Sequence, residues 1–236
     1  MFKTEHELVG LFTSDIQAFS LSQLRRQNHH IDYLLEVDLG HGVADIVLYS
    51  HATCPTDRKM RLNKFDIHVY SILQERRCAL TLFDIQDTTK SSSQKVSQSV
   101  RKLTEEGFVE PISDAFKVSR RYEAHAQTIV AIEAKLTNWK RALSQAYKYH
   151  WFSHYSFVLL PESQVRSAKE NLDRFKHLKV GLASIDSEGR VDLIYTPPRR
   201  KPYSPSMEMQ LNESVLHQWR EKLQPRAEVL VPLFVE

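Results

Sequence analysis

The sequence predicts an α/β domain that is interrupted by a smaller, mainly helical domain. Residues 4–50 and 127–195 alternate between the hydrophobic spacing of helices and the alternating or continuous apolar runs of strands. Residues 64–122 differ, because three helical segments follow one another before a short hairpin. A chain of 236 residues is long enough for this organisation, with ample apolar side chains for a core.

We expect the larger domain to comprise residues 1–60 and 123–236, and to begin with an amphipathic helix at 4–20. Thr4 and Glu7 have the spacing of a capping box at the start of this helix. The glycines of LGHG then mark a turn within a hairpin at 31–50. The later strands are expected at residues 127–136, 155–160, 179–186, 190–195 and, as an edge strand, 228–236. The later helices are expected at residues 137–150, 162–177 and 212–223, the last one capped by Asn212.

The inserted domain, residues 61–122, has the element order of a winged helix-turn-helix. A helix, a short helix, a longer helix and two short strands follow one another, with helices at 64–75, 79–88 and 90–106. The apolar side chains of the third helix share one face, which leaves a polar and basic face for a nucleic-acid groove. The alternative is a solvated face on a module that binds another protein. The side chains expected to bind nucleic acid are Ser93, Gln94, Lys95, Gln98, Arg101, Lys102, Lys117, Arg120 and Arg121.

Composition and charge narrow the class of protein. The hydrophobic content of 42% and the charged content of 26% are typical of a globular protein. The net charge of +3 permits a nucleic-acid partner without requiring one. The chain has no glycine-rich phosphate loop, which argues against an ATPase. It also has no apolar run of about 20 residues and no basic, apolar leader, so we expect a cytoplasmic protein with no membrane partner.

Charged residues inside two apolar strands point to a site. Asp45 lies within GVADIVLY, and Glu133 and Lys135 lie two residues apart in IVAIEAKL. Side chains two residues apart on a strand share a face, and buried charges are costly unless they are paired or bind a ligand. If the two strands are neighbours, the three side chains converge. A divalent cation between the two carboxylates would relieve their repulsion, and oxygen ligands favour Mg²⁺ or Mn²⁺ over zinc.

These residues resemble a known family. Asp45, followed in a later strand by Glu133-Ala134-Lys135, resembles the signature of the PD-(D/E)xK phosphodiesterase superfamily. Gln145 and Tyr149, in the helix after that strand, match the QxxxY motif of the branch that is similar to RecB-type nucleases. The chain departs from the pattern at Ala44, where a proline is common, and in the long gap that the inserted domain fills.

The resemblance implies a restriction-endonuclease-like core, with the element order αβββαβ, and a role for each matching residue. Asp45, Glu133 and the backbone carbonyl of Ala134 would hold Mg²⁺ or Mn²⁺, Lys135 would be catalytic, Gln145 would orient the site, and Tyr149 would face the substrate. Such families often add an acid from the first helix, for which Glu7 is the candidate. The implied function is a metal-dependent nuclease that hydrolyses phosphodiester bonds in DNA bound by the winged helix.

Two alternatives stay open at this point. Glu133 and Lys135 could form an exposed pair on an edge strand, with Asp45 capping a turn. The fold could also serve without chemistry, as a DNA-binding or adaptor protein in a larger complex, such as a defence or transposition assembly. Cleavage of both DNA strands by a protein with one site would imply a homodimer.

Overall fold

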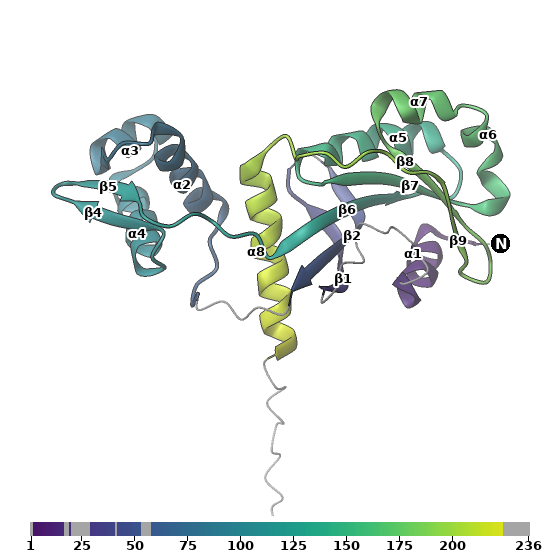
Figure 1. Cartoon of the computed structure of the whole chain (residues 1–236), viewed down its shortest axis with the longest axis horizontal. Helices are drawn as coiled ribbons and strands as arrows, with labels where there is room; N and C mark the ends of the chain where they lie inside the picture. Colours follow the sequence, from purple (N-terminus) through teal and green to yellow (C-terminus); the bar gives the residue numbers. More distant parts are fainter. Residues whose placement is uncertain (1, 17–18, 20–28, 41, 53–57, 224–236) are drawn as a thin grey trace, which may run out of the picture.

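A mixed six-stranded sheet flanked by helices makes the chain an α/β protein, as the sequence predicts (Figure 1). The strand order is β1-β2-β6-β7-β8-β9, in which β6, β7 and β8 run parallel and the other neighbours are antiparallel. The computed structural model describes residues 2–16, 19, 29–40, 42–52 and 58–223. The strands are β1 His29–Asp38, β2 Val43–Ala52, β6 Ala126–Ala134, β7 Tyr155–Pro161, β8 Gly181–Ile185 and β9 Val191–Tyr195.

Helices pack on both faces of this sheet, and each face has its own apolar core. On one face, Leu8 and Phe12 of α1 are buried against β2, β6 and β7. On the other face, α5, α7 and α8 contribute buried side chains such as Ala146, Phe175 and Leu211. No helix in the described ranges is both long and apolar enough to cross a membrane. The helices are α1 Glu5–Ser14, α5 Trp139–Lys148, α6 Arg166–Lys169, α7 Leu172–Leu178 and α8 Pro205–Leu223.

The segment between β2 and β6 forms a second unit with its own core. Its three helices and its hairpin appear in the predicted order, and a two-residue strand, β3, adds to the hairpin as a third strand. Side-chain caps begin each helix: Asn63 and Thr81 form capping boxes, and the hydroxyl of Ser92 accepts from Lys95 N. The elements are α2 Lys64–Arg76, β3 Leu80–Thr81, α3 Leu82–Thr89, α4 Ser93–Glu105, β4 Val109–Ile112 and β5 Ala115–Val118.

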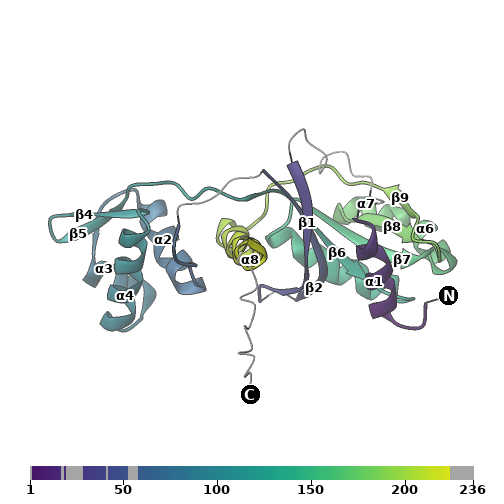
Figure 2. The same cartoon turned by 90° about the horizontal axis from the view of Figure 1, so that it is seen from below.

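A buried network of charges joins the second unit to helix α8, which lies between that unit and the sheet in both views (Figures 1 and 2). Glu213 of α8 accepts from both connecting segments. Arg58 donates to its two oxygens at 2.6 and 2.9 Å, Leu62 N donates at 2.8 Å, and the Tyr122 hydroxyl donates at 2.8 Å. Because one carboxylate holds both segments, it limits how far the unit can turn relative to the sheet.

Several sequence-based predictions of element boundaries are wrong. The helix predicted at 79–88 begins only at Leu82, because Leu80 and Thr81 pair with β5 as strand β3. Helix α8 starts at Pro205, not at residue 212, and Asn212 is a buried interior residue whose side chain accepts from Ala126 N at 2.7 Å. The stretch 162–177 is not one helix, because it breaks near Asn171, whose side chain donates to Ser167 O. Helix α1 ends at Ser14, before the predicted residue 20. The strand predicted at 228–236 lies outside the described residues.

Candidate active site

The site begins where two neighbouring strands stop pairing. Strands β2 and β6 pair directly as far as Ile46 and Ile132, one residue before Asp45 and Glu133. Beyond that point the amide of Ala134 donates to the Asp45 carboxylate, at 2.7 Å. The Asp45 side chain thus accepts from an amide at the end of the β-ladder, and this bond fixes its orientation. The two predicted strands are neighbours, and the insertion between them does not separate their acids.

Lys135 lies directly after β6, and its ammonium group contacts three carboxylates. Its Nζ is 2.9 Å from Glu133 Oε1, 3.1 Å from Glu5 Oε2 and 3.7 Å from Asp45 Oδ2. The lysine side chain is only 14% exposed and that of Glu133 only 1% exposed, which excludes the alternative of a solvent-facing surface pair. One cation among three acids leaves a local excess of negative charge when all of them are ionised.

Burial dominates the electrostatics of the two strand acids. Loss of solvent raises the pKa of Asp45 above its ordinary range, although Ala134 N and Lys135 oppose this. Burial likewise raises the pKa of Glu133, where the negative charge of Asp45 adds to the effect and bonds from Tyr149 and Lys135 oppose it. Burial acts to lower the pKa of Lys135, but Glu133 and Asp45 more than offset this and raise it. The ammonium form is therefore strongly favoured.

Tyr149, at the end of α5, connects the helix to Glu133. Its hydroxyl contacts Glu133 Oε2 and lies 2.6 Å from the Val43 carbonyl oxygen. A phenol carries a single proton, so the carboxylate and the carbonyl compete for it. Burial beside Glu133 also raises the pKa of the Tyr149 hydroxyl, which keeps it protonated.

The Lys135 ammonium lies 2.9 Å from Glu133 Oε1, whereas the buried Gln145 Oε1, one helical turn before Tyr149, has no hydrogen-bond donor within the described part of the chain. A buried acceptor usually has a partner, so Gln145 suits a bound water or cation. The carboxylates of Asp45 and Glu133 and the carbonyl of Ala134 are the hard oxygen ligands that Mg²⁺ prefers. The chemistry of these oxygen ligands therefore fits a divalent cation.

The side chains, as they are arranged, do not form a complete set of metal ligands. No cluster of three or more His, Cys, Asp or Glu side chains that could hold a metal occurs among residues 2–223 where the structure describes them. The Lys135 ammonium, which also donates to Ala134 O at 3.1 Å, supplies the positive charge between the acids. Binding of a divalent cation would require Lys135 to move away from Ala134 and the carboxylates.

The acid that α1 contributes is Glu5, whereas Glu7 lies elsewhere. Glu7 accepts from the amide of Lys3 at 2.7 Å at the exposed helix start. Glu5 lies three and seven residues before the buried Leu8 and Phe12, so it lies at the edge of the face that packs on the sheet. This spacing was the sequence signal that distinguishes the two acids. Gln145 lies on α5, one helical turn before Tyr149.

The residues predicted to bind nucleic acid divide into two groups. Lys102 forms an ion pair with the buried Asp66 at 2.8 Å, and Arg120 stacks over Phe108 at 4.9 Å while donating to Glu106 O. These two side chains therefore stabilise the unit itself. The others, among which Arg101 forms an ion pair with Glu105 at 3.7 Å, are exposed: Ser93, Gln94, Lys95, Gln98, Arg101, Lys117 and Arg121.

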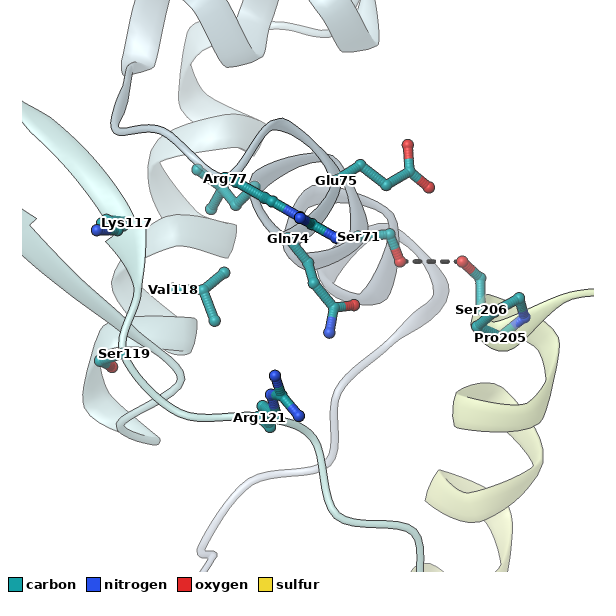
Figure 3. Close-up of a pocket in the computed structure, with 11 residues that line it drawn as sticks. Ser71, Gln74, Glu75, Arg77, Lys117, Val118, Ser119, Arg121, Pro205 and Ser206 are labelled. Carbon is teal, nitrogen blue, oxygen red and sulfur yellow. Dashed lines mark hydrogen bonds between the residues drawn. The ribbon is translucent and has the colours of Figure 1, made fainter.

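A basic pocket of about 940 Å³ lies between the end of α2, strand β5 and the start of α8. Figure 3 shows Gln74 and Arg121 extending towards each other across it. A hydrogen bond of 2.9 Å between Ser71 and Ser206 joins α2 to α8 at its margin (Figure 3). The pocket therefore adjoins a direct contact between the two units.

Comparisons with known proteins find no match: no family model, no curated protein and no solved structure is similar to the chain.

Proposed function

We propose that the chain is a metal-dependent nuclease of the PD-(D/E)xK type that hydrolyses phosphodiester bonds in DNA. The observation that carries this proposal is the convergence of Asp45, Glu133 and Lys135, although an entire inserted unit separates Asp45 from the other two in sequence. With the insertion left out, the order α1, β1, β2, β6, α5, β7 matches the αβββαβ order of a restriction-endonuclease-like core. Gln145 and Tyr149 lie on the helix directly after the Glu133 strand, as that resemblance requires.

Each residue of the site has a distinct role in the proposed reaction. Asp45, Glu133 and the Ala134 carbonyl would hold Mg²⁺ or Mn²⁺, which supplies charge stabilisation and a more acidic bound water. The amide of Ala134 holds Asp45, and Tyr149 holds Glu133, so both carboxylates are oriented before substrate arrives. The ammonium group of Lys135, once turned from the acids towards the phosphate, would stabilise the charge that develops on the scissile oxygens.

In the same proposal the unit between β2 and β6 is a winged helix-turn-helix that binds DNA. The exposed side chains at the start of α4, such as Gln94 and Lys95, are suited to groove and phosphate contacts. The structural roles of Lys102 and Arg120 reduce the number of cations available for DNA. We therefore expect modest, salt-dependent affinity from this unit alone.

A second candidate is a DNA-binding or adaptor protein that has the nuclease fold but no catalysis, within a larger complex. The observation that favours it is the position of Lys135, whose ammonium already neutralises part of the charge that a metal would neutralise. We also expect a cytoplasmic protein that forms a homodimer if it cleaves both DNA strands. For the adaptor, we expect a role in a defence or transposition complex.

Cleavage of supercoiled plasmid in Mg²⁺ and in Mn²⁺, with EDTA as the blank, tests the nuclease proposal. We expect Glu133→Gln and Lys135→Ala each to lower the cleavage rate by at least about 100-fold, because each removes a group that acts on the reacting phosphate or its metal. Glu170→Gln and Lys176→Ala, both at exposed positions, are the matched controls and should cleave normally. Equal cleavage by all five proteins would contradict the site, and DNA binding without cleavage by the wild type would favour the adaptor.

A further inference from the structure

A second groove, of about 600 Å³, lies between the hairpin turn of β1 and β2, helix α2 and the start of α8. Its lining contains Lys64, Phe65 and His68 of α2, Lys95 of α4, and Trp151. No aspartate or glutamate is among its described lining residues. The groove therefore has a basic character that does not depend on the overall charge of the chain.

Two cations of this groove are available to a ligand. Lys64 and Lys95 are exposed, and neither forms an ion pair within the part of the chain that the structure describes. The ammonium of Lys95 lies 4.2 Å from the centre of the Phe65 ring, so a cation and an aromatic face are presented together. The nearest acid on α2, Asp66, is engaged by Ser99 and Lys102.

Exposed aromatic rings line the groove and continue beyond it. Trp151 is 42% exposed, and the ring of Tyr203, itself 49% exposed, meets it edge-on at 6.0 Å. Arg200 lies over the Tyr203 ring at 4.2 Å. Aromatic faces next to cations are the usual platform for stacked bases along a phosphate backbone.

Contacts of the β1–β2 hairpin with Tyr149 connect the rim of the groove with the candidate active site. Its rim includes Gly40, and two residues later Gly42 packs close to the ring of Tyr149. The Tyr149 hydroxyl in turn contacts Val43 O and Glu133. These contacts connect the rim of the groove to Glu133 through the buried Tyr149.

We infer that this groove binds a single-stranded segment of nucleic acid and leads it to the active site. A space of about 600 Å³ has the size of a small-molecule site, which holds one or two unpaired nucleotides but not a duplex. Bases also expose their faces for stacking on Trp151 only when they are unpaired. This inference rests on the proposed nuclease function, and it assigns an unpaired end or flap as the preferred substrate.

Binding in EDTA tests the groove without depending on cleavage. The probes are a labelled oligodeoxythymidine of about 20 nucleotides and a duplex of the same length. We expect Lys64→Glu, and separately Trp151→Ala, to raise the Kd for the single strand by about tenfold or more and the Kd for the duplex by less than about twofold. The matched controls Lys176→Glu on α7 and Phe83→Ala, an exposed ring on α3, should bind both probes as the wild type does.

Tryptophan fluorescence gives a readout that a folding defect would not imitate. The single strand should quench the wild-type emission, and Trp151→Phe should lose most of that quenching, because Trp139 is buried on α5 and the half-buried Trp219 is not among the residues that line the groove. Undiminished quenching in Trp151→Phe, or an equal loss of single-strand and duplex affinity in the groove variants, would overturn the inference. Because Glu133→Gln should still bind the single strand, absence of cleavage and absence of groove binding are distinguishable results.

Discussion

The protein contains two groups of buried charges that differ in their hydrogen bonding. The first, which we call the joint, connects the second unit to α8 through Glu213 and Glu106, and the second, at the strand ends, is the cluster around Lys135. At the joint, Glu213 accepts from Arg58, Leu62 N and Tyr122, and Glu106 accepts from Lys59 N and Met60 N at 2.7–3.1 Å. At the strand ends, Asp45 and Glu133 share Lys135 with Glu5. The joint surrounds its acids with donors, whereas the strand ends place several acids around one donor.

The difference separates a network that holds elements in place from one that fits the proposed active site. Each acid of the joint accepts several hydrogen bonds, and the partners of such a buried pair depend on each other. A buried acid whose pKa is raised is less stable in its ionised form than it would be in water, and Glu133 is such an acid. We therefore expect the joint to contribute to stability and the strand ends to reduce it.

The joint should give the largest change in stability. Glu213→Ala leaves the Arg58 guanidinium buried without its main acceptor, so we expect the free energy of unfolding to fall by about 3–5 kcal/mol. Urea denaturation measures it. Glu188→Ala, an exposed residue, is the control and should change the free energy by less than about 0.5 kcal/mol. A similar small change for Glu213→Ala would remove the contrast between the two groups.

At the strand ends, removal of the Glu133 charge should raise the free energy of unfolding instead of lowering it. Because the pKa of Glu133 is raised in the fold, the native state holds its proton more tightly than the unfolded chain does. The contribution of Glu133 to the free energy of unfolding is therefore lost as the pH rises from the ordinary glutamate pKa of 4.5 through the raised pKa of the folded state. Glu133→Gln removes this dependence. We expect the variant to be as stable as the wild type near pH 5 and more stable by up to about 1 kcal/mol near pH 8.

Thermal unfolding of both proteins across this pH range measures the effect. Glu170→Gln, at an exposed site directly after α6, is the control and should follow the wild type at every pH. If Glu133→Gln instead becomes less stable than the wild type as the pH rises, the ionised carboxylate is a stabilising partner of Lys135. The strand ends would then not differ from the joint.

Local sequence patterns were sufficient to predict much of the fold and the centre of the site. Strand alternation placed Glu133 and Lys135 on one face, and the apolar run around Asp45 made a neighbouring strand the simplest arrangement. Hairpin glycines and side-chain caps are also local signals, which is why the hairpin and the starts of α1, α2 and α5 lie within about two residues of their predicted positions.

The missed features depend on residues that are far apart in sequence. Asn212 has the side chain of a helix cap, but its true partner is Ala126 N, on a strand at the other end of the domain. Arg58 and Tyr122 gave no sign of meeting on Glu213, because each lies in an irregular connecting segment. Glu5 was within reach of the sequence, since its spacing from Leu8 and Phe12 places it beside the packed face of α1.

The smallest expected change is at Tyr149, the residue that links α5 to the site. Tyr149→Phe removes a hydroxyl that Val43 O and Glu133 share, so we expect stability to fall by less than about 1 kcal/mol. The hydroxyl also acts to lower the pKa of Glu133. Its removal should raise that pKa further and move the acid limb of the pH profile of cleavage to higher pH. Tyr147→Phe, on the exposed side of the same helix, is the control and should leave the profile in place. A Tyr149→Phe profile that coincides with the wild type would mean that Lys135, and not the helix, governs the ionisation of Glu133.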